Sequence, residues 1–156
     1  MQTIQIYTDG GCRNTGNNSG DTVNPNDKAA WATLLIFGKY TKELTGSEFG
    51  KTNNYMEITA VIKGLSALKR FDLPVIVYSD SAYVINTLNE KWYQNWQKNN
   101  WHTSKKQLVK NKELWQQLIT LINKFKNIKF IKVKGHANNK YNNYVDALLN
   151  KTMDQM

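Results

Sequence analysis

Hydrophobic and polar residues alternate in some stretches of this chain and recur at helical spacing in others, and this pattern predicts its elements. Near the N-terminus, Ile4 and Ile6 alternate with polar residues, and a period of two is typical of a strand. The pair Gly10-Gly11 predicts the end of this strand, and the polar residues 14–28 predict a loop. The expected strands span residues 2–8, 30–38, 41–46, 75–78 and 127–133.

Helical spacing first appears after the strands expected at 30–38 and 41–46, which we expect to form a hairpin. Apolar residues recur at Met56, Val61 and Leu65, as they do on one face of a helix. The expected helices span residues 54–70, 81–89, 114–122 and 144–153, with Thr52 or Asn53 as the cap of the first and Ser79 or Asp80 as the cap of the second.

The order of these elements predicts one α/β domain over residues 1–156. It runs strand–strand–strand–helix–strand–helix–helix–strand–helix. A hairpin joins antiparallel strands, whereas a strand–helix–strand unit joins parallel strands. We therefore expect a five-stranded mixed sheet flanked by helices.

Composition adds a strong positive charge. The 156 residues include 21 Lys and Arg against 12 Asp and Glu, a net charge of +9. That balance favours a phosphate-rich partner, although a soluble protein from a lysine-rich proteome has it too. Cys12 is the only cysteine, which excludes an internal disulfide and a multi-cysteine zinc site and is typical of the reducing cytoplasm. We see no signal peptide and no apolar run of about 20 residues, so we expect no membrane contact.

Four acids stand near the ends of expected elements, each inside a short polar motif. Asp9 follows the first strand and Asp80 follows the fourth, while Glu57 lies in the first turns of a helix. Asp146 begins the last expected helix. If the first and fourth strands are parallel neighbours, Asp9 and Asp80 leave the same end of the sheet, where α/β folds place their sites. Each acid alone has an ordinary explanation as a turn, cap or helix-start residue, but together they indicate one site.

Carboxylates that converge favour a divalent metal ion. They repel one another unless a cation lies between them, and ligands that are all oxygen suit Mg²⁺ or Mn²⁺ better than zinc. Two such ions about 3.5–4 Å apart activate water and stabilise the leaving oxygen in phosphodiester cleavage. His136, in a Gly- and Asn-containing loop after the last strand, is a candidate proton shuttle, with a plain surface histidine as the alternative.

Residues 91–112 combine positive charge with aromatic rings. They include six lysines and no acid, with Trp92, Trp96 and Trp101 among them. Cations and flat rings suit the backbone and bases of a nucleic acid. Alternatively, Trp96 and Trp101 pack the segment onto the domain and the lysines are merely solvated. We expect structural tryptophans and phosphate-binding lysines in the same segment.

Together these motifs resemble bacterial type 1 ribonuclease H over nearly the whole chain. Each motif is weak alone, but six of them stand in the order of that family. They are Tyr7-Thr8-Asp9-Gly10, the run Thr52–Glu57, Tyr78-Ser79-Asp80-Ser81, the tryptophan segment, Lys110–Trp115, and Val133-Lys134-Gly135-His136 followed by Asn142 and Asp146.

The resemblance implies a ribonuclease H-like fold and an endonuclease that hydrolyses the RNA strand of RNA/DNA hybrids, leaving 5′-phosphate and 3′-hydroxyl ends. It implies two Mg²⁺ ions per site, with Mn²⁺ as a substitute. By analogy Asp9 bridges the two ions, and Asp146 holds the ion that activates water. Glu57 and Asp80 hold the ion near the leaving oxygen, and Glu57 lies near the ribose 2′-hydroxyl. His136 matches the family's loop histidine, which assists turnover.

The resemblance also implies how the hybrid is held. Residues from about 90 to 112 match a basic protruding handle, and the DNA strand follows a channel beside it. A cytoplasmic monomer without an obligate protein partner is expected. The substrate-binding candidates are Cys12, Asn14, Thr52, Asn53, Tyr83, Trp92, Lys98 and Asn142.

The chain departs from the family pattern in two loops. The loop after the first strand is longer than the family's short turn, so the residue that contacts ribose stays open among Asn14, Thr15 and Asn17. Asn138 stands where glycine is common. Two other functions remain possible at this point: a nucleic-acid-binding module without catalysis, and another nuclease of the same broad fold, such as an integrase-like or resolvase-like enzyme. The intact acid set disfavours the first, and the tryptophan segment with the Val-Lys-Gly-His motif disfavours the second.

Overall fold

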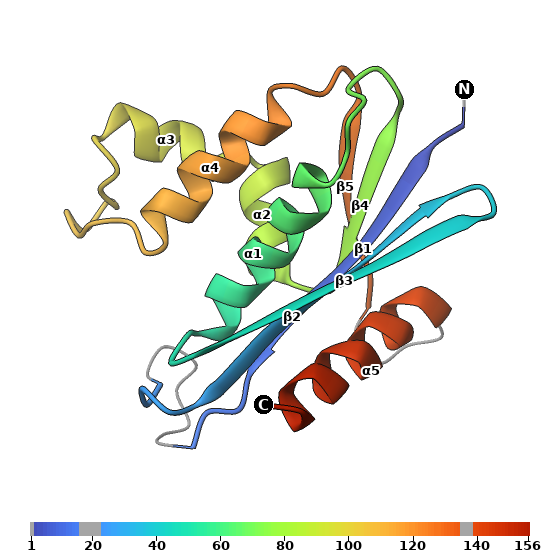
Figure 1. The fold of residues 1–156 in the computed structure, drawn as a ribbon. Helices are drawn as coiled ribbons and strands as arrows, with labels where there is room; N and C mark the ends of the chain where they lie inside the picture. The colour runs from blue at the N-terminus through green and yellow to red at the C-terminus, as the bar shows by residue number, and fades with distance from the viewer. Residues whose placement is uncertain (1, 16–22, 135–138) are drawn as a thin grey trace.

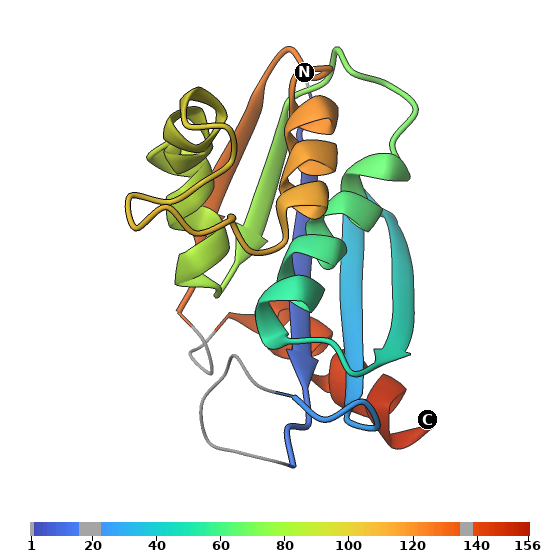
Figure 2. The same ribbon diagram turned by 90° about the vertical axis from the view of Figure 1, so that its left-hand side faces the viewer.

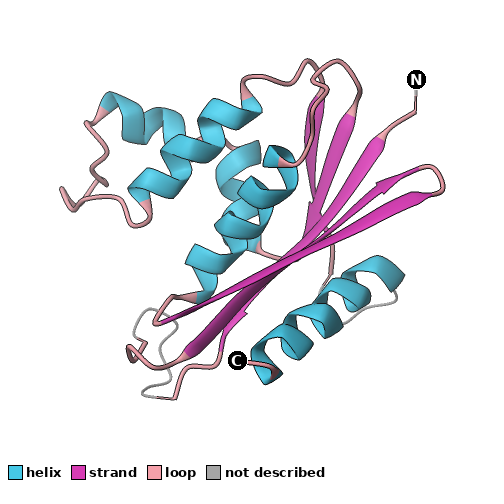
Figure 3. Ribbon diagram, viewed as in Figure 1, coloured by secondary structure: helices cyan, strands magenta, loops and turns pink. Residues whose placement is uncertain are grey.

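The computed structural model describes residues 2–15, 23–134 and 139–156, which form five strands and five helices (Figures 1 and 3). Strands β1 to β5 span Ile4–Cys12, Lys28–Phe37, Tyr40–Phe49, Val75–Ser79 and Ile128–Lys132. Helices α1 to α5 span Asn53–Ser66, Ala82–Asn89, Trp92–Lys98, Lys112–Ile122 and Lys140–Asp154. None of these helices is long and apolar enough to cross a bilayer.

The five strands form one mixed sheet in the order β3-β2-β1-β4-β5. β1, β2 and β3 pair in antiparallel fashion, whereas β4 pairs parallel to β1 on one side and to β5 on the other. The expected hairpin and the expected mixed sheet are therefore confirmed. The parallel register of β1 and β4 places the carboxyl ends of both strands at the same edge of the sheet.

Strand β1 is longer than the sequence predicts. It continues through Gly10-Gly11 to Cys12 because β2 pairs with it along this whole stretch, with Gly10 opposite Trp31. The pairing of β1 with β4 covers only Ile4–Tyr7. Asp9 therefore lies inside β1 and not beyond it, in the part of the strand that extends past the end of its parallel neighbour.

Polar caps set the starts of the helices around the sheet. The Thr52 hydroxyl accepts a hydrogen bond from the Tyr55 amide at 3.1 Å, which confirms Thr52 as the cap of α1. The cap of α2 is Ser81, whose hydroxyl accepts from the Val84 amide at 3.2 Å. The prediction of Ser79 or Asp80 as this cap was wrong, because Ser79 still belongs to β4.

Helix α5 begins earlier than its apolar spacing suggests. Asn139 caps it by accepting a hydrogen bond from the Asn142 amide at 2.9 Å, and the helix starts at Lys140. The first turn is polar, so hydrophobic periodicity could not reveal it. Asp146 consequently lies in the second turn of α5 and does not begin the helix.

Helices cover both faces of the sheet. Figure 2 shows α1 and α4 in front of the sheet and α5 behind it. The larger core lies between the sheet and α1, α2 and α4, and includes Ile6, Val77 and Trp115. The core under α5 includes Tyr7 and Val145. Because side chains alternate along β1, Ile6 and Tyr7 enter opposite cores, and Asp9 shares the α5 face with Tyr7.

The basic segment between α2 and α4 contains the short helix α3, which the sequence analysis did not predict. Trp96 packs against Trp101 at 6.2 Å and against the buried Trp115 at 5.8 Å between ring centroids, so the expected packing role of these tryptophans is confirmed. Trp92 remains 39% exposed. Among the described residues, all five non-glycine residues with positive φ lie from Lys91 to Asn111. Tryptophan packing and backbone hydrogen bonds, such as that from the Val109 amide to the Trp101 carbonyl oxygen, stabilise this irregular backbone.

Candidate active site

Three carboxylates from three elements meet at the edge of the sheet where β4 ends. Asp9 lies in β1, Glu57 lies in α1, and Asp80 is the residue directly after β4. One oxygen atom from each lies within 4.8 Å of the other two. The structure therefore brings together three of the four acids that were expected to share one site.

Gly10 allows α1 to come this close to β1. A Cβ atom at Gly10 would lie 2.3 Å from the carbonyl carbon of Met56 and 2.4 Å from the amide nitrogen of Glu57. These neighbours are helix backbone, which cannot turn aside as a side chain can. Glycine after Asp9 is thus required by the contact that brings Asp9 and Glu57 together.

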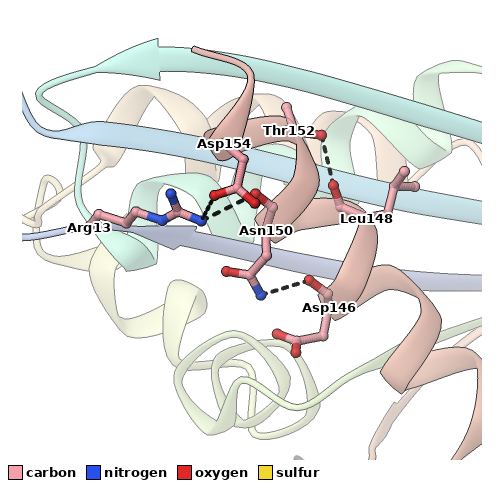
Figure 4. Close-up of polar contacts among 6 residues, drawn as sticks. All are labelled: Arg13, Asp146, Leu148, Asn150, Thr152 and Asp154. Carbon is pink, nitrogen blue, oxygen red and sulfur yellow. Dashed lines mark hydrogen bonds and ion pairs between the residues drawn. The ribbon is translucent and has the colours of Figure 1, made fainter.

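Asp146 reaches the same place from the opposite face of the sheet. Its helix, α5, runs beside β1, and its carboxyl group raises the pKa of Asp9 through hydrogen bonding and charge repulsion, after the larger effect of burial. Figure 4 shows Asp146 farther from Arg13 along α5 than Asn150 and Asp154 are. The Asn150 side-chain amide donates to the Asp146 carbonyl oxygen at 3.0 Å, and Arg13 pairs with Asp154 at 2.7 Å (Figure 4). Asp146 thus lies beside Asp9, next to the group formed by Asp9, Glu57 and Asp80.

Burial and mutual repulsion make the charged forms of these acids costly. Burial, then Asp80 and then Asp146, raise the pKa of Asp9 from 3.8 to about 8. Burial, followed by repulsion from Asp9 and Asp80, also raises the pKa of Glu57 well above its usual value. Carboxyl groups with raised pKa values that share a concave site are typical of functional sites. In the absence of a cation, the raised pKa of Asp9 favours its protonated form at neutral pH.

The Glu57 side chain carries an acceptor that the described protein groups leave unsatisfied. It is only 7% exposed, and its Oε1 atom is buried without a hydrogen-bond partner among the described residues. A buried acceptor without a donor costs about 1–3 kcal/mol, and a bound metal ion would satisfy it. The donors are all carboxylate oxygens, which suit a hard divalent ion such as Mg²⁺. The residues present therefore fit a divalent-metal site.

The predicted substrate-binding residues lie in different settings. The Asn53 side-chain oxygen accepts from the Cys12 amide at 2.6 Å and so ties the end of β1 to the start of α1. Asn14 follows β1 and is half-buried, and Lys98 is exposed at the end of α3. Asn142 is only 2% exposed, one turn before Asp146. Their contacts with a substrate stay predictions. His136 lies outside the described residues.

A groove leads from the start of α1 to the basic segment. Its volume is about 560 Å³, and it lies between the residues around the α1 cap and the chain that precedes α4. The Tyr83 hydroxyl in this groove accepts a hydrogen bond from the indole nitrogen of Trp115 at 2.9 Å, which fixes the tyrosine ring. No substrate role was expected for Asn54, Thr103, Gln107 or Asn111, because nothing in the sequence shows that they line a common groove. The lining residues are Thr52, Asn54, Tyr83, Trp96, Thr103, Gln107, Leu108, Val109, Lys110 and Asn111.

Solved structures share this fold. The crystal structure of LC9-RNase H1, described as a type 1 RNase H with the type 2 active-site motif, aligns with a TM-score of 0.80 at 21% identity and covers 99% of this chain and 73% of its own. LC11-RNase H1, solved in complex with an RNA/DNA hybrid, aligns with a TM-score of 0.67 at 20% identity and covers 97% of both chains. At these identities the similarity shows the fold.

Sequence comparison shows the family. The family model for RNase H matches residues 1–154. Ribonuclease H of Clostridium botulinum (strain Hall) is 48% identical over 155 residues, covering 99% of this chain and 98% of its own. Ribonuclease H of Caldicellulosiruptor saccharolyticus is 43% identical over 156 residues, covering 100% and 99%. With this match over nearly its whole length, and with four acids gathered at one edge of the sheet, the chain belongs to the ribonuclease H family.

Proposed function

We propose that this protein is an endoribonuclease that hydrolyses the RNA strand of RNA/DNA hybrids with two divalent metal ions and leaves 5′-phosphate and 3′-hydroxyl ends. The observation that carries the proposal is the cluster of Asp9, Glu57 and Asp80 within 4.8 Å, with Asp146 beside Asp9, in a chain of net charge +9. Family membership supports the same activity, and the related LC11-RNase H1 was solved with an RNA/DNA hybrid.

The four carboxylates are the proposed metal ligands. When bound, Mg²⁺ supplies an activated water and charge stabilisation for the leaving oxygen, and Mn²⁺ can replace it. Asp9, which lies near the other three acids, would contribute to both ions. Asp146 holds the side of the site toward α5, and Glu57 with Asp80 holds the other side. Glu57 is also proposed to face the ribose 2′-hydroxyl, the group that distinguishes RNA from DNA.

His136 is proposed to move a proton during product departure. An imidazole titrates near neutral pH and so can accept and release a proton within one turnover. This role comes from the family resemblance of Val133-Lys134-Gly135-His136. Replacing His136 by Ala is expected to lower kcat without changing folding.

The groove and the basic segment are the proposed grip on the hybrid. Thr52 and Asn53 at the start of α1 offer a hydroxyl and an amide to phosphate and sugar, and Tyr83 and Trp92 offer rings to the DNA strand. Exposed lysines such as Lys98 neutralise phosphates. Cys12, Asn14 and Asn142 are proposed as further contacts near the cluster, within a monomeric cytoplasmic enzyme. The substrate-binding assignments together are Cys12, Asn14, Thr52, Asn53, Tyr83, Trp92, Lys98 and Asn142.

One cleavage experiment tests this function. The protein is incubated with labelled RNA/DNA hybrid, double-stranded DNA or double-stranded RNA, in Mg²⁺ or in EDTA. We expect cutting of the RNA strand of the hybrid alone, and only with Mg²⁺. Binding of the hybrid without cutting would instead favour the non-catalytic module, and cutting of DNA would favour another nuclease of this fold.

The matched variants are Asp9→Asn and Asp72→Asn. Both remove one negative charge, but Asp72 is an exposed residue that pairs with Arg70 at 2.7 Å between α1 and β4. We expect Asp9→Asn to abolish cleavage while leaving hybrid binding largely intact, and Asp72→Asn to cut like the parent. Equal rates for Asp9→Asn and the parent would refute the metal-bridging role of Asp9.

A further inference from the structure

Three tyrosines form one aromatic cluster on the α5 side of the sheet. Tyr7 in β1 and Tyr78 in β4 are direct neighbours in the parallel register, and their rings stack at 4.4 Å between centroids with an interplanar angle of 9°. Tyr141 in the first turn of α5 packs on Tyr7 at 5.2 Å and 45°. The cluster thus joins β1, β4 and α5 at a single point.

Each tyrosine precedes one of the proposed metal ligands on its own element. Asp9 follows Tyr7 by two residues on the same face of β1, and Asp80 follows Tyr78 by two residues. Two strand residues advance the chain about 6.6 Å. Along α5, the five residues from Tyr141 to Asp146 advance it about 7.5 Å. Packing Tyr141 on Tyr7 therefore brings Asp146 level with Asp9.

Helix α5 is joined to β1 on both sides of Asp146. At its start, Asn139 caps the helix, and its side chain lies near the Tyr7 hydroxyl, whose pKa is raised by burial and by Tyr78 and lowered by Asn139. Near its end, Arg13 binds the Asn150 carbonyl oxygen at 3.2 Å and the Asp154 carboxylate at 2.7 Å (Figure 4). The Arg13–Asp154 pair is solvent-exposed and so contributes little free energy. The buried tyrosine contact is the stronger constraint on where Asp146 lies.

We propose that Tyr7, Tyr78 and Tyr141 are positioning residues that set α5 against β1 and β4 so that Asp146 completes the carboxylate cluster. The inference rests on the proposed metal-dependent function. Loss of a ring would let the start of α5 shift along the sheet, and the oxygen atoms of Asp146 would leave the positions that a metal ion requires. Groups that orient metal ligands typically change metal affinity or activity about 10–100-fold when they are removed.

Tyr141→Leu is the main test, because leucine keeps an apolar side chain and suits a helix but has no ring. Tyr141→Phe keeps the ring and is the expected rescue. Tyr144→Leu is the matched control, since Tyr144 lies on the same helix, is 47% exposed, and hydrogen-bonds through its hydroxyl to Glu43 on β3. Thermal unfolding first establishes a temperature at which every variant is folded.

Two measurements are then made at that temperature. Calorimetric titration with Mg²⁺ should show affinity for Tyr141→Leu weakened about 10-fold or more, as expected for a residue that orients a ligand. It should show parental affinity for Tyr141→Phe and Tyr144→Leu. With hybrid substrate, Tyr141→Leu should lower kcat by a similar factor and leave KM within about twofold, because the grip on the hybrid is elsewhere.

The outcomes separate the inference from the proposed function. Parental Mg²⁺ affinity and kcat in a folded Tyr141→Leu would overturn the positioning role, even if the variant is less stable. If Tyr141→Leu does not fold, Tyr78→Leu, which removes the half-buried ring of β4, decides by the same two readouts. A parent that binds Mg²⁺ but leaves the hybrid uncut would refute the proposed function, while the affinities would still test the tyrosines.

Discussion

At the scale of single residues, the site depends on groups whose properties arise only from folding. Asp9 is an ordinary aspartate in the sequence, yet burial and two neighbouring acids raise its pKa to about 8. The pKa of Glu57 is raised as well, first by burial. The sequence indicated which acids would meet, because each stands near the end of an element. It could not indicate how deeply they would be buried, because burial depends on how closely α1 and α5 pack against β1.

The raised pKa values predict how the stability of the metal-free protein depends on pH. A carboxyl group whose pKa is higher in the folded than in the unfolded state binds more protons when folded, so its stabilising contribution is present at low pH and is lost as pH rises. For Asp9 the loss runs from its ordinary value of 3.8 up to about 8. Urea unfolding in EDTA should therefore give a lower free energy of unfolding at pH 8 than at pH 5.

Asp9→Asn should reduce the difference in the free energy of unfolding between pH 5 and pH 8, because asparagine carries no charge at either pH. Asp72→Asn should keep the parental pH dependence of the free energy of unfolding. The hydrogen bond from Arg70 lowers the pKa of Asp72, so this residue does not titrate between pH 5 and pH 8. If Asp9→Asn leaves the difference in the free energy of unfolding between pH 5 and pH 8 unchanged, Asp9 does not cause the pH dependence.

Gly10 gives a second prediction at this scale. Gly10→Ala would place a Cβ atom 2.3 Å from helix backbone, so β1 and α1 must separate. We expect a loss of about 3 kcal/mol in the free energy of unfolding, as in overpacked cores, together with loss of hybrid cleavage at temperatures where the variant is folded. Gly11→Ala is the control, because its Cβ would meet the Leu149 side chain at 3.4 Å. Equal effects of the two substitutions would refute the close-approach argument.

At the scale of elements, the sequence predicted the strands and the long helices well, and the reasons for its errors are physical. β1 runs through Gly10-Gly11 because pairing with β2 overrides the turn preference of glycine. Helix α3 was missed because it spans only seven residues, too few for apolar spacing to mark it as a helix. The first turn of α5 was missed because most of its residues are polar. The position of α5, and hence of Asp146, depends on strand register and on the packing of the helix against the sheet. These contacts join residues far apart in the sequence and so leave no local sequence pattern.

The lysines of the basic segment between α2 and α4 are expected to contribute to hybrid binding. Lys105 and Lys106 are exposed in the turn before α4. Replacing both by Gln should weaken hybrid binding and reduce its salt dependence, since each lost phosphate contact lowers the slope of log K against log salt by about 0.9. Fluorescence anisotropy at several salt concentrations measures both quantities.

The matched control replaces Lys39 and Lys42 by Gln. These exposed lysines lie at the turn and start of the β2–β3 hairpin, away from the carboxylates, and their loss changes the net charge equally. If both pairs of substitutions reduce the slope of log K against log salt to the same extent, the effect comes from the net charge of the protein. The basic segment would then have no specific role in binding the hybrid.

At the scale of the whole molecule, a positively charged protein brings acids from separate elements together at one place. β1 supplies Asp9 from the centre of the sheet, and its neighbour β4 leads into Asp80. α1 approaches from one face with Glu57, and α5 from the other with Asp146. This arrangement needs the complete fold, because no two of the four residues are close in sequence. A site of this kind should be occupied by metal ions only while all four elements are packed together.

Anomalous diffraction from crystals soaked in Mn²⁺ tests this convergence most directly. We predict anomalous peaks within coordination distance of the carboxylates of Asp9, Glu57, Asp80 and Asp146, and their loss in crystals of Asp9→Asn. Peaks found only elsewhere on a protein saturated with Mn²⁺, or four carboxylates on separate faces with no ion between them, would contradict the metal site and the catalytic role that depends on it.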